Sequence, residues 1–469
     1  MEEGGRGHLR KSPWPPPPKS TFMNNIDASY MKLALKLAAK GAGWVSPNPM
    51  VGAVLVQQGQ VVGRGYHRRV GAPHAEVEAL RRAGDAARGA DLYVTLEPCN
   101  HHGRTPPCTR AILAAGVRRV IMATPDPNPR VAGQGAAFLS SHGVEVEAGA
   151  LAEEARRLNE AWFKWTETVL PFVIAKAACS LDGKIATAGG ESQWLTGEAA
   201  RAFGHRLRHE CDAILVGIDT VLADDPQLTT RLGRGRKMVG GEGQGLFRKW
   251  PLPPSPKPPL PTPYGYGGTG VPPVHWQGRS VKDMEQPSPA ALSEKTRQNR
   301  RFSELTENRK PKTENSGKDP IRVVLDSRLR IPLTARLLHL DSPAPTWVAC
   351  TEGAPKDKMK ALKELGAEVL VLPAAPESGR VSLPALLKLL GRQQVQSLLV
   401  EGGAEVLGAF FEAKLVDKFY FFYAPLFLGG QEAPGVLGGR GIAHLKDAKQ
   451  ALNLTSRKIG PDLLITGYL

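Results

Sequence analysis

A histidine and two cysteines stand in this chain at a spacing that suits a metal ion, namely His74, Cys99 and Cys108. Zinc in a catalytic site takes three protein ligands and leaves the fourth position to water. Glu76 lies two residues after His74, so on a continuous helix the two side chains would point to nearly opposite faces. We therefore predict that His74 lies at a helix entry, and that Glu76 leans over the open position without binding the metal.

This arrangement predicts a hydrolytic reaction on a ring amine. Bound zinc lowers the pKa of water from 15.7 to about 7, and in zinc deaminases a glutamate moves the proton to the departing ammonia. Glu76 is the candidate for this catalytic role. A helix opening at Thr109 would aim its free N–H groups at the Cys108 thiolate. His101 and His102, on the same loop as Cys99, remain rival ligands.

Residues 25–168 alternate between helical and strand patterns, which predicts a sheet covered by helices on both faces. An apolar helical period begins at Tyr30 and stops at Gly41. Two strands follow, joined by a hairpin at Gln58-Gly59. Residues 74–84 then read as a helix that Gly84 ends.

Residues 169–469 form a second predicted α/β domain, which opens with an apolar strand and a glycine turn. Residues 211–226 are read as another of its strands. Residues 233–319 lose all apolar period, as do residues 1–24, so we predict a disordered insertion and a disordered tail. The insertion contains a G-x-G-x-x-G match at Gly265, Gly267 and Gly270. Prolines surround it and no strand precedes it, so we do not read it as a dinucleotide site.

The net charge of +16 would ordinarily suggest nucleic acid as a partner. Residues 233–319 carry +8 of it and residues 1–24 carry +2, so the remainder is modest and suits phosphorylated small molecules. No apolar run is long enough to span a bilayer, and the N-terminus lacks a secretion signal. Five cysteines are too few for a disulfide framework in a chain of this length. We expect a cytoplasmic protein with reduced thiols and with neither nucleic acid nor membrane as a partner.

The segments "SPNPMVGAVLV", "GYHRRVGAPHAEVEAL", "YVTLEPCNHHGRTPPCTRAIL" and "DPNPRVAGQG" together resemble the deaminase half of the bifunctional riboflavin-biosynthesis deaminase/reductases. The resemblance covers most of residues 26–165 and implies a cytidine-deaminase-like, three-layer α/β/α domain. It also implies that Asn48 contacts the pyrimidine. The nine-residue separation of the two cysteines departs from the C-x-x-C of nucleic-acid deaminases.

The segments "KAACSLDGKIA", "GESQWLT", "GIDTVLADDPQLTTR", "IRVVLDS", "LVEGGAEVLGAF" and "IGPDLL" resemble the reductase half of the same family. That half is similar to dihydrofolate reductase in fold and uses NADPH. The resemblance implies that the cofactor is lined by Ala178, Trp194, Thr220, Asp224, Ser327 and the Gly403 turn. It implies that the substrate is faced by Ser192, Arg208, Leu228, Arg231 and Glu401. Because the planar fork of arginine suits a phosphate, we assign the ribose phosphate to Arg208 and Arg231.

The expected function is deamination of a diamino-hydroxy-phosphoribosylamino-pyrimidine with Zn²⁺, followed by NADPH-dependent reduction of the ribosyl side chain to ribityl. We expect a homo-oligomer. One alternative is a nucleic-acid base deaminase helped by the basic insertion. Another is a working deaminase beside a reductase half that the insertion has disabled.

Overall fold

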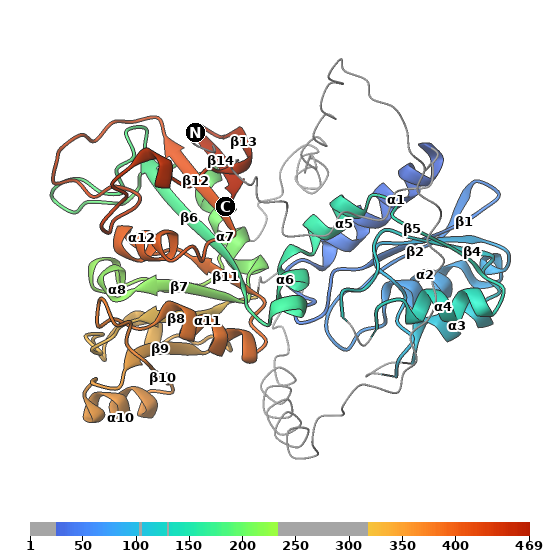
Figure 1. The fold of residues 1–469 in the computed structure, drawn as a ribbon, viewed down its shortest axis with the longest axis horizontal. Coiled ribbons are helices and arrows are strands. Elements are labelled where there is room, and N and C mark those ends of the chain that lie inside the picture. Colours follow the sequence, from blue (N-terminus) through green and yellow to red (C-terminus); the bar gives the residue numbers. More distant parts are fainter. Residues whose placement is uncertain (1–24, 103–105, 129–130, 233–317) are drawn as a thin grey trace, which may run out of the picture. The chain divides into compact units, whose positions relative to one another are not determined.

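The computed structural model describes residues 25–102, 106–128, 131–232 and 318–469 (Figure 1). The predicted tail at residues 1–24, the glycine match at residues 265–270, and all but the last two residues of the predicted insertion lie outside the described residues.

The N-terminal part of the chain is built on a five-stranded sheet of order β2-β1-β3-β4-β5. Its strands are β1 (Gly52–Gln57), β2 (Gln60–Tyr66), β3 (Asp91–Val94), β4 (Arg119–Met122) and β5 (Glu145–Ala148). Its helices are α1 (Asn25–Ala38), η1 (Ala39–Gly41), α2 (Ala75–Ala83), η2 (Gly84–Ala87), α3 (Cys108–Ala114), α4 (Gln134–Ser141), α5 (Ala152–Leu158) and α6 (Glu160–Thr168).

Alternation along β1 gives the sheet two apolar faces. Ala53 and Leu55 pack into one core with α2, α3 and α4, while Val54 and Val56 pack into another with α1 and α5. The expected three layers are therefore confirmed. The predicted hairpin is also present, because Gln58 and Gly59 both have positive φ, at 49° and 75°, as a two-residue turn requires.

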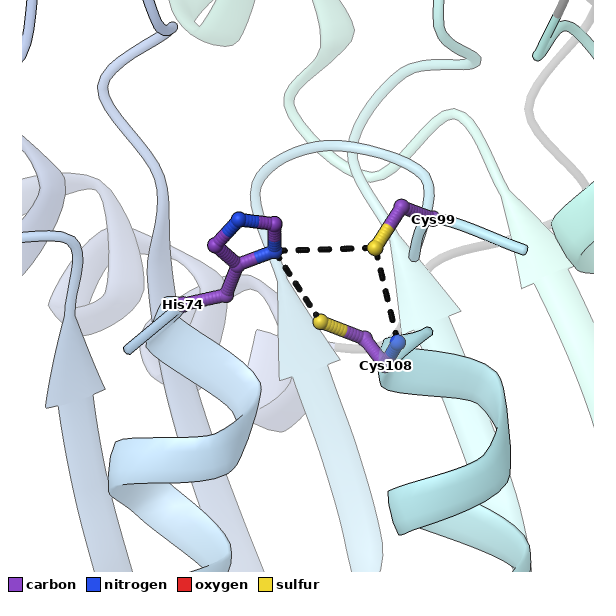
Figure 2. A group of neighbouring side chains, drawn as sticks. All are labelled: His74, Cys99 and Cys108. Atoms are coloured by element: carbon purple, nitrogen blue, oxygen red, sulfur yellow. Dashed lines mark hydrogen bonds between the residues drawn. The ribbon is translucent and has the colours of Figure 1, made fainter. Parts of the chain in front are cut away.

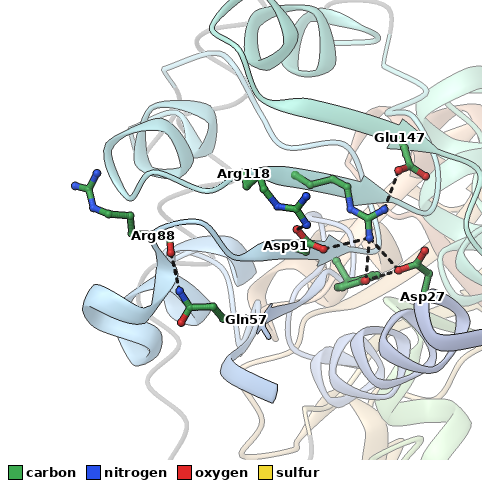
Figure 3. Close-up of polar contacts among 8 residues, drawn as sticks. Asp27, Gln57, Arg88, Asp91, Arg118 and Glu147 are labelled. Atoms are coloured by element: carbon green, nitrogen blue, oxygen red, sulfur yellow. Dashed lines mark hydrogen bonds and ion pairs between the residues drawn. The ribbon is translucent and has the colours of Figure 1, made fainter. Parts of the chain in front are cut away.

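Charged side chains gather where β3 and β4 begin, beside β5 (Figure 3). The Arg119 guanidinium lies 3.1 Å from Asp27, 3.2 Å from Asp91 and 2.9 Å from Glu147. Tyr93 donates to the same Asp27 carboxylate. Cys99 follows the opposite, carboxyl end of β3, so this ion cluster fixes strand starts and lies away from the predicted metal ligands.

The C-terminal part is built on a nine-stranded sheet of order β10-β9-β8-β7-β11-β6-β12-β14-β13. Its strands are β6 (Phe172–Ser180), β7 (Ala213–Gly217), β8 (Ile321–Leu325), β9 (Thr346–Thr351), β10 (Glu368–Leu372), β11 (Ser397–Val400), β12 (Lys418–Ala424), β13 (Leu452–Ile459) and β14 (Asp462–Tyr468). Its helices are α7 (Glu198–Glu210), α8 (Ile218–Asp224), η3 (Arg336–Leu338), α10 (Lys356–Glu364), α11 (Leu383–Arg392), α12 (Ala404–Glu412) and η4 (Leu445–Asp447).

Seven strands from β10 to β12 run parallel, and β14 and β13 add an antiparallel edge. Apolar residues of α7, α8 and α10 fill the core on one face, and those of α11 and α12 fill the core on the other. The strand predicted over residues 211–226 is shorter than expected. It ends at Gly217, and Ile218–Asp224 turns into helix α8.

The strand order brings three chain segments to one edge of this sheet. β7 pairs with β8 on one side and with β11 on the other, all parallel, so their carboxyl ends lie side by side. Thr220, Ser327 and Glu401 follow these three strand ends. In open α/β sheets ligands bind at such an edge. Within the described residues, no helix is both long and apolar enough to cross a membrane.

Candidate zinc centre and reductase site

The structure brings His74, Cys99 and Cys108 together (Figure 2). The Nδ1 atom of His74 lies 3.2 Å from the Cys108 sulfur and 3.5 Å from the Cys99 sulfur. Zinc bonds of about 2.0–2.3 Å in a tetrahedron separate their donor atoms by distances of this order. A histidine and two thiolates form a donor set that zinc accepts, so the three side chains fit this metal.

Two of the three ligands lie at helix starts, and the third, Cys99, lies in the loop that follows β3. His74 is the N-cap of α2, as predicted, and Cys108 is the first residue of α3. The main-chain N–H of Cys108 donates to the Cys99 sulfur at 3.4 Å. Hydrogen bonding from the Cys108 thiol is the largest influence on Cys99 and lowers its pKa to about 4, which favours the thiolate that metal binding requires.

Glu76 lies in the first turn of α2 and is 3% exposed. Its Oε2 atom has no hydrogen-bond partner within the described residues. A buried carboxylate oxygen is costly to leave unpaired, so this atom is available to a substrate or a water. His101 and His102, the rival ligands, are exposed and are not members of the metal-binding group in the described part of the chain.

Asn48, which is predicted to contact the pyrimidine, contacts a residue that the sequence did not mark as functional. Its Nδ2 atom lies 3.0 Å from Nε2 of His67, and the His67 ring centre lies 5.5 Å from that of His74. Burial lowers the pKa of His67, which favours a neutral ring. The only signal was a histidine at the end of β2, and a lone histidine is too common to stand out.

A second missed residue is Glu97, a 3% exposed carboxylate between β3 and Cys99. It accepts main-chain N–H groups from Asp126 at 3.2 Å, Gly133 at 3.0 Å, Gly135 at 3.0 Å and Ala136 at 3.1 Å. In the sequence, Glu97 is a single acidic residue next to an apolar run, and no pattern there indicates these hydrogen bonds. Glu97 therefore fastens the segment after β4 beside the zinc ligands.

In the C-terminal part, Thr220 and Gly403 meet where β7 and β11 end. The N–H of Gly403 donates to Oγ1 of Thr220 at 3.2 Å. Gly403 is the N-cap of α12, and in the described part of the chain no capping side chain bonds the first N–H groups of that helix. A Cβ added at Gly403 would lie 3.5 Å from Thr220 Oγ1. This bare turn fits a phosphate group of a dinucleotide.

Arg208 and Glu401, both predicted to face the substrate, bind each other. Nε and Nη2 of Arg208 donate to the two carboxylate oxygens of Glu401 at 2.8 and 2.9 Å. Lys176 Nζ lies 3.5 Å from the same carboxylate. Glu401 is deeply buried, but the opposing charge of Arg208, followed by that of Lys176, outweighs this and lowers its pKa to about 2.

Two further predicted residues, Ser192 and Asp224, form a hydrogen bond at 3.5 Å. Trp194 is 68% exposed, with the Arg201 guanidinium 4.9 Å from its ring centre. An exposed indole on a cation provides a flat surface for a ligand ring.

Ser327 accepts an N–H from Val381 at 3.0 Å, and Ala178 lies half-buried in β6. Leu228 has a positive φ of 55° and is 3% exposed within the core, so only its main chain can face a substrate. Among the described residues, no hydrogen bond or ion pair joins Ala178, Trp194, Leu228 or Ser327 to another predicted site residue.

Two family models match the chain. The cytidine and deoxycytidylate deaminase zinc-binding region matches residues 24–124, and the RibD C-terminal domain matches residues 171–251 and 284–465. The riboflavin biosynthesis protein RibD of Bacillus amyloliquefaciens is 37% identical over 94% of this chain and 96% of its own length. RibD of Escherichia coli is 36% identical over 94% and 98%.

Solved structures agree with these matches. Acinetobacter baumannii RibD, form 1, has a TM-score of 0.69 with 33% identity, and it covers 94% of this chain and 98% of its own. A diaminohydroxyphosphoribosylaminopyrimidine deaminase and amino-phosphoribosylamino-uracil reductase from Thermotoga maritima has a TM-score of 0.66 with 29% identity over the same shares.

Proposed function

The chain belongs to the RibD family of bifunctional riboflavin-biosynthesis deaminase/reductases, and on this basis we propose which of its residues carry out the two reactions. The substrate is a diamino-hydroxy-phosphoribosylamino-pyrimidine, which loses its ring amine before its ribose is reduced to a ribityl chain. Residues 25–168 carry the first reaction and residues 169–469 the second.

In the deaminase half, His74, Cys99 and Cys108 hold zinc, which when bound activates a water for attack on the ring carbon bearing the amine. Glu76 takes a proton from the incoming water and passes it to the departing ammonia, and its unpaired Oε2 atom supports that role. Asn48 contacts the pyrimidine, and its hydrogen bond to His67 fixes its amide orientation.

The observation that carries this assignment is the convergence of one ring nitrogen and two sulfurs beside the unpaired Glu76 oxygen. Metal analysis of the purified protein should find about one zinc per chain, and Cys99→Ser should lose both the zinc and ammonia release. The matched controls are His101→Ala and His102→Ala, which should retain zinc. A full zinc complement in Cys99→Ser would contradict the proposed ligand set.

In the reductase half, the turn formed by Thr220 and Gly403 would hold NADPH, which when bound would supply a hydride to the anomeric carbon of the ribose. Trp194, Ala178, Asp224 and Ser327 line the cofactor. The open N–H groups at the start of α12 support this placement.

On the substrate side, Ser192 and the main chain of Leu228 face the pyrimidine ribotide, and Arg231 binds its phosphate. Arg208 and Glu401 border the same site, where their two-point ion pair gives both side chains a fixed orientation. NADPH oxidation, followed by absorbance with the deaminated substrate, tests this half. A folded, zinc-loaded protein that oxidises no NADPH would favour a reductase half without catalytic function.

We also propose that the protein is cytoplasmic and forms a homo-oligomer. β13 is the edge strand of its sheet, and Leu452 and Leu454 on it are 52% and 60% exposed. An edge strand with exposed leucines can pair with the same strand of a second copy. Light scattering across a concentration series tests this, and a single monomeric mass throughout would refute it.

A further inference from the structure

Helix α7 holds the segment that carries Arg231 by two side chains. Nη1 of Arg208 donates to the main-chain carbonyl of Thr229 at 3.3 Å. One turn earlier on the helix, Nδ1 of His205 accepts the main-chain N–H of Arg231 at 3.3 Å. The backbone of residues 229–231 is therefore attached to α7 immediately before the end of the described segment.

The hydrogen bond from Arg231 requires His205 to be an acceptor. A protonated imidazole has no lone pair, so Nδ1 must be unprotonated and the ring proton lies on Nε2. Burial and the charges of Arg208 and Arg231 lower the pKa of His205 to about 4, against the opposite effects of Glu401 and the Thr229 carbonyl. The neutral, accepting ring is therefore the form present at pH 7.

The two arginines predicted to bind the phosphate differ in how many of their side-chain N–H groups are already hydrogen-bonded. All three side-chain nitrogens of Arg208 already donate hydrogen bonds, two of them to Glu401 and one to Thr229. Arg231 has an exposed side chain and, among the described residues, makes no ion pair. Its pKa is lowered by partial burial and by the positive charges of Arg208 and Arg336, so the three cations are near enough to repel one another. An anion there would relieve their repulsion.

We propose that His205 is a positioning residue for substrate phosphate, which holds the Arg231 main chain so that the guanidinium faces the ribose phosphate. The inference rests on the proposed function, in which Arg231 binds that phosphate. His205 acts through Arg231 and need not touch the substrate itself. Fixing the backbone before binding lowers the entropy cost of ordering a long side chain.

Reductase kinetics with the deaminated substrate and with its dephosphorylated analogue test the proposal. His205→Ala should raise KM for the phosphorylated substrate about tenfold and change kcat by less than about twofold. KM for the dephosphorylated analogue and for NADPH should not change. His205→Asn should restore most of the affinity, because its Oδ1 atom replaces Nδ1 as the acceptor.

The double variant separates positioning from an independent contact. If His205 acts through Arg231, His205→Ala should add nothing to the KM increase of Arg231→Ala. If the KM increases of the two single variants multiply in the double variant, the inference is overturned. It is also overturned if KM is unchanged in His205→Ala while Arg231→Ala raises it. An unchanged KM in Arg231→Ala would instead refute the proposed phosphate role of that arginine.

His209 provides a matched control for loss of stability. It lies one turn further along α7, and its Nδ1 atom accepts the main-chain N–H of Lys318 at 2.9 Å. His209→Ala thus removes the same kind of bond from a segment that carries no proposed phosphate ligand. The His209 ring also contacts the ring of Trp44, at 5.1 Å between ring centres, so this variant should lower the unfolding temperature at least as much as His205→Ala. It should nevertheless leave KM within about twofold of the parent. An equal KM increase in His209→Ala would show a general structural effect and overturn the proposal.

Discussion

Arg208 on α7 and Glu401 after β11 form a two-point ion pair, with N···O distances of 2.8 and 2.9 Å, across 193 positions of sequence. The side chains of both residues are mostly buried, at 16% and 9% exposed. A pair of this kind is costly to break from one side, because the remaining charge stays buried without its partner. The pair therefore links the stability of the reductase half to the shape of its proposed substrate site.

Glu401→Gln should lower the free energy of unfolding at pH 7 by about 3 kcal/mol. The pKa of Glu401 falls from its usual 4.5 to about 2 in the folded protein, so the folded state binds this proton less readily than the unfolded state. The stabilisation is therefore complete above pH 4.5 and is lost as the pH falls towards 2.

Unfolding temperatures of parent and variant, compared between pH 7 and pH 3, measure this effect, and their difference should shrink with acidification. Glu405→Gln is the control, since Glu405 is 58% exposed and pairs with the exposed Arg380. It should cost less than about 1 kcal/mol. A difference between parent and Glu401→Gln that stays constant with pH would contradict the ion-pair account.

Glu76→Gln should lower the kcat of deamination by about 10²–10⁴, because the amide cannot take a proton from water or deliver it to ammonia. Zinc content should remain at the parent level, since Glu76 is not a member of the metal-binding group. NADPH oxidation with the deaminated substrate should also be unchanged. Loss of zinc together with activity would show that Glu76 supports the metal and leave its proton-transfer role without support.

The zinc centre could be predicted from the sequence because local structure creates it. His74, Cys99 and Cys108 stand at the start of a helix, after a strand and at the start of the next helix, and all three positions are visible as changes of pattern. Once the alternation of elements is right, the order of the ligands along the chain brings them to one edge of the sheet.

The reductase contacts were only partly predictable, because they depend on strand order. The resemblance marked Arg208 and Glu401 separately as substrate residues. They can bond to each other because β11 lies between β7 and β6 in the sheet, and no local sequence pattern reveals that strand order. The burial of the Leu228 side chain likewise depends on packing against distant residues, as does the bond from Arg231 to His205.

Arg119→Leu should destabilise the deaminase half by about 3–5 kcal/mol, because it leaves the buried carboxylate of Asp27 without its cation. Arg118→Leu is the matched control. That neighbouring side chain is 61% exposed and pairs with Asp91 at 2.6 Å, so its loss should cost less than about 1 kcal/mol (Figure 3). Urea unfolding followed by tryptophan fluorescence compares the two variants. Equal losses of unfolding free energy in the two variants would show that the burial of Arg119 does not determine how much the ion cluster stabilises the fold.

Replacing residues 233–317 with a short Gly-Ser linker should preserve both activities within about threefold. The flanking segments already meet, because the Thr230 N–H donates to Asp319 at 2.7 Å and its hydroxyl donates to the Lys318 carbonyl at 3.0 Å. A few residues can therefore join Leu232 to Lys318 without moving Arg231. The shorter loop should raise the free energy of unfolding by about 2 kcal/mol through a lower closure entropy.

The same deletion tests whether the positive charge serves a nucleic-acid partner. It removes a net charge of +8, so any salt-sensitive RNA binding by the parent should vanish while turnover of the small substrate persists. The readouts are ammonia release, NADPH oxidation and RNA retention at two salt concentrations. If the deleted protein folds, keeps its zinc and releases ammonia but no longer oxidises NADPH, the segment contributes to the reductase site. The hydrogen bonds that attach the flanking residues Arg231 and Lys318 to His205 and His209 of α7 would then be tested first as the route of that contribution.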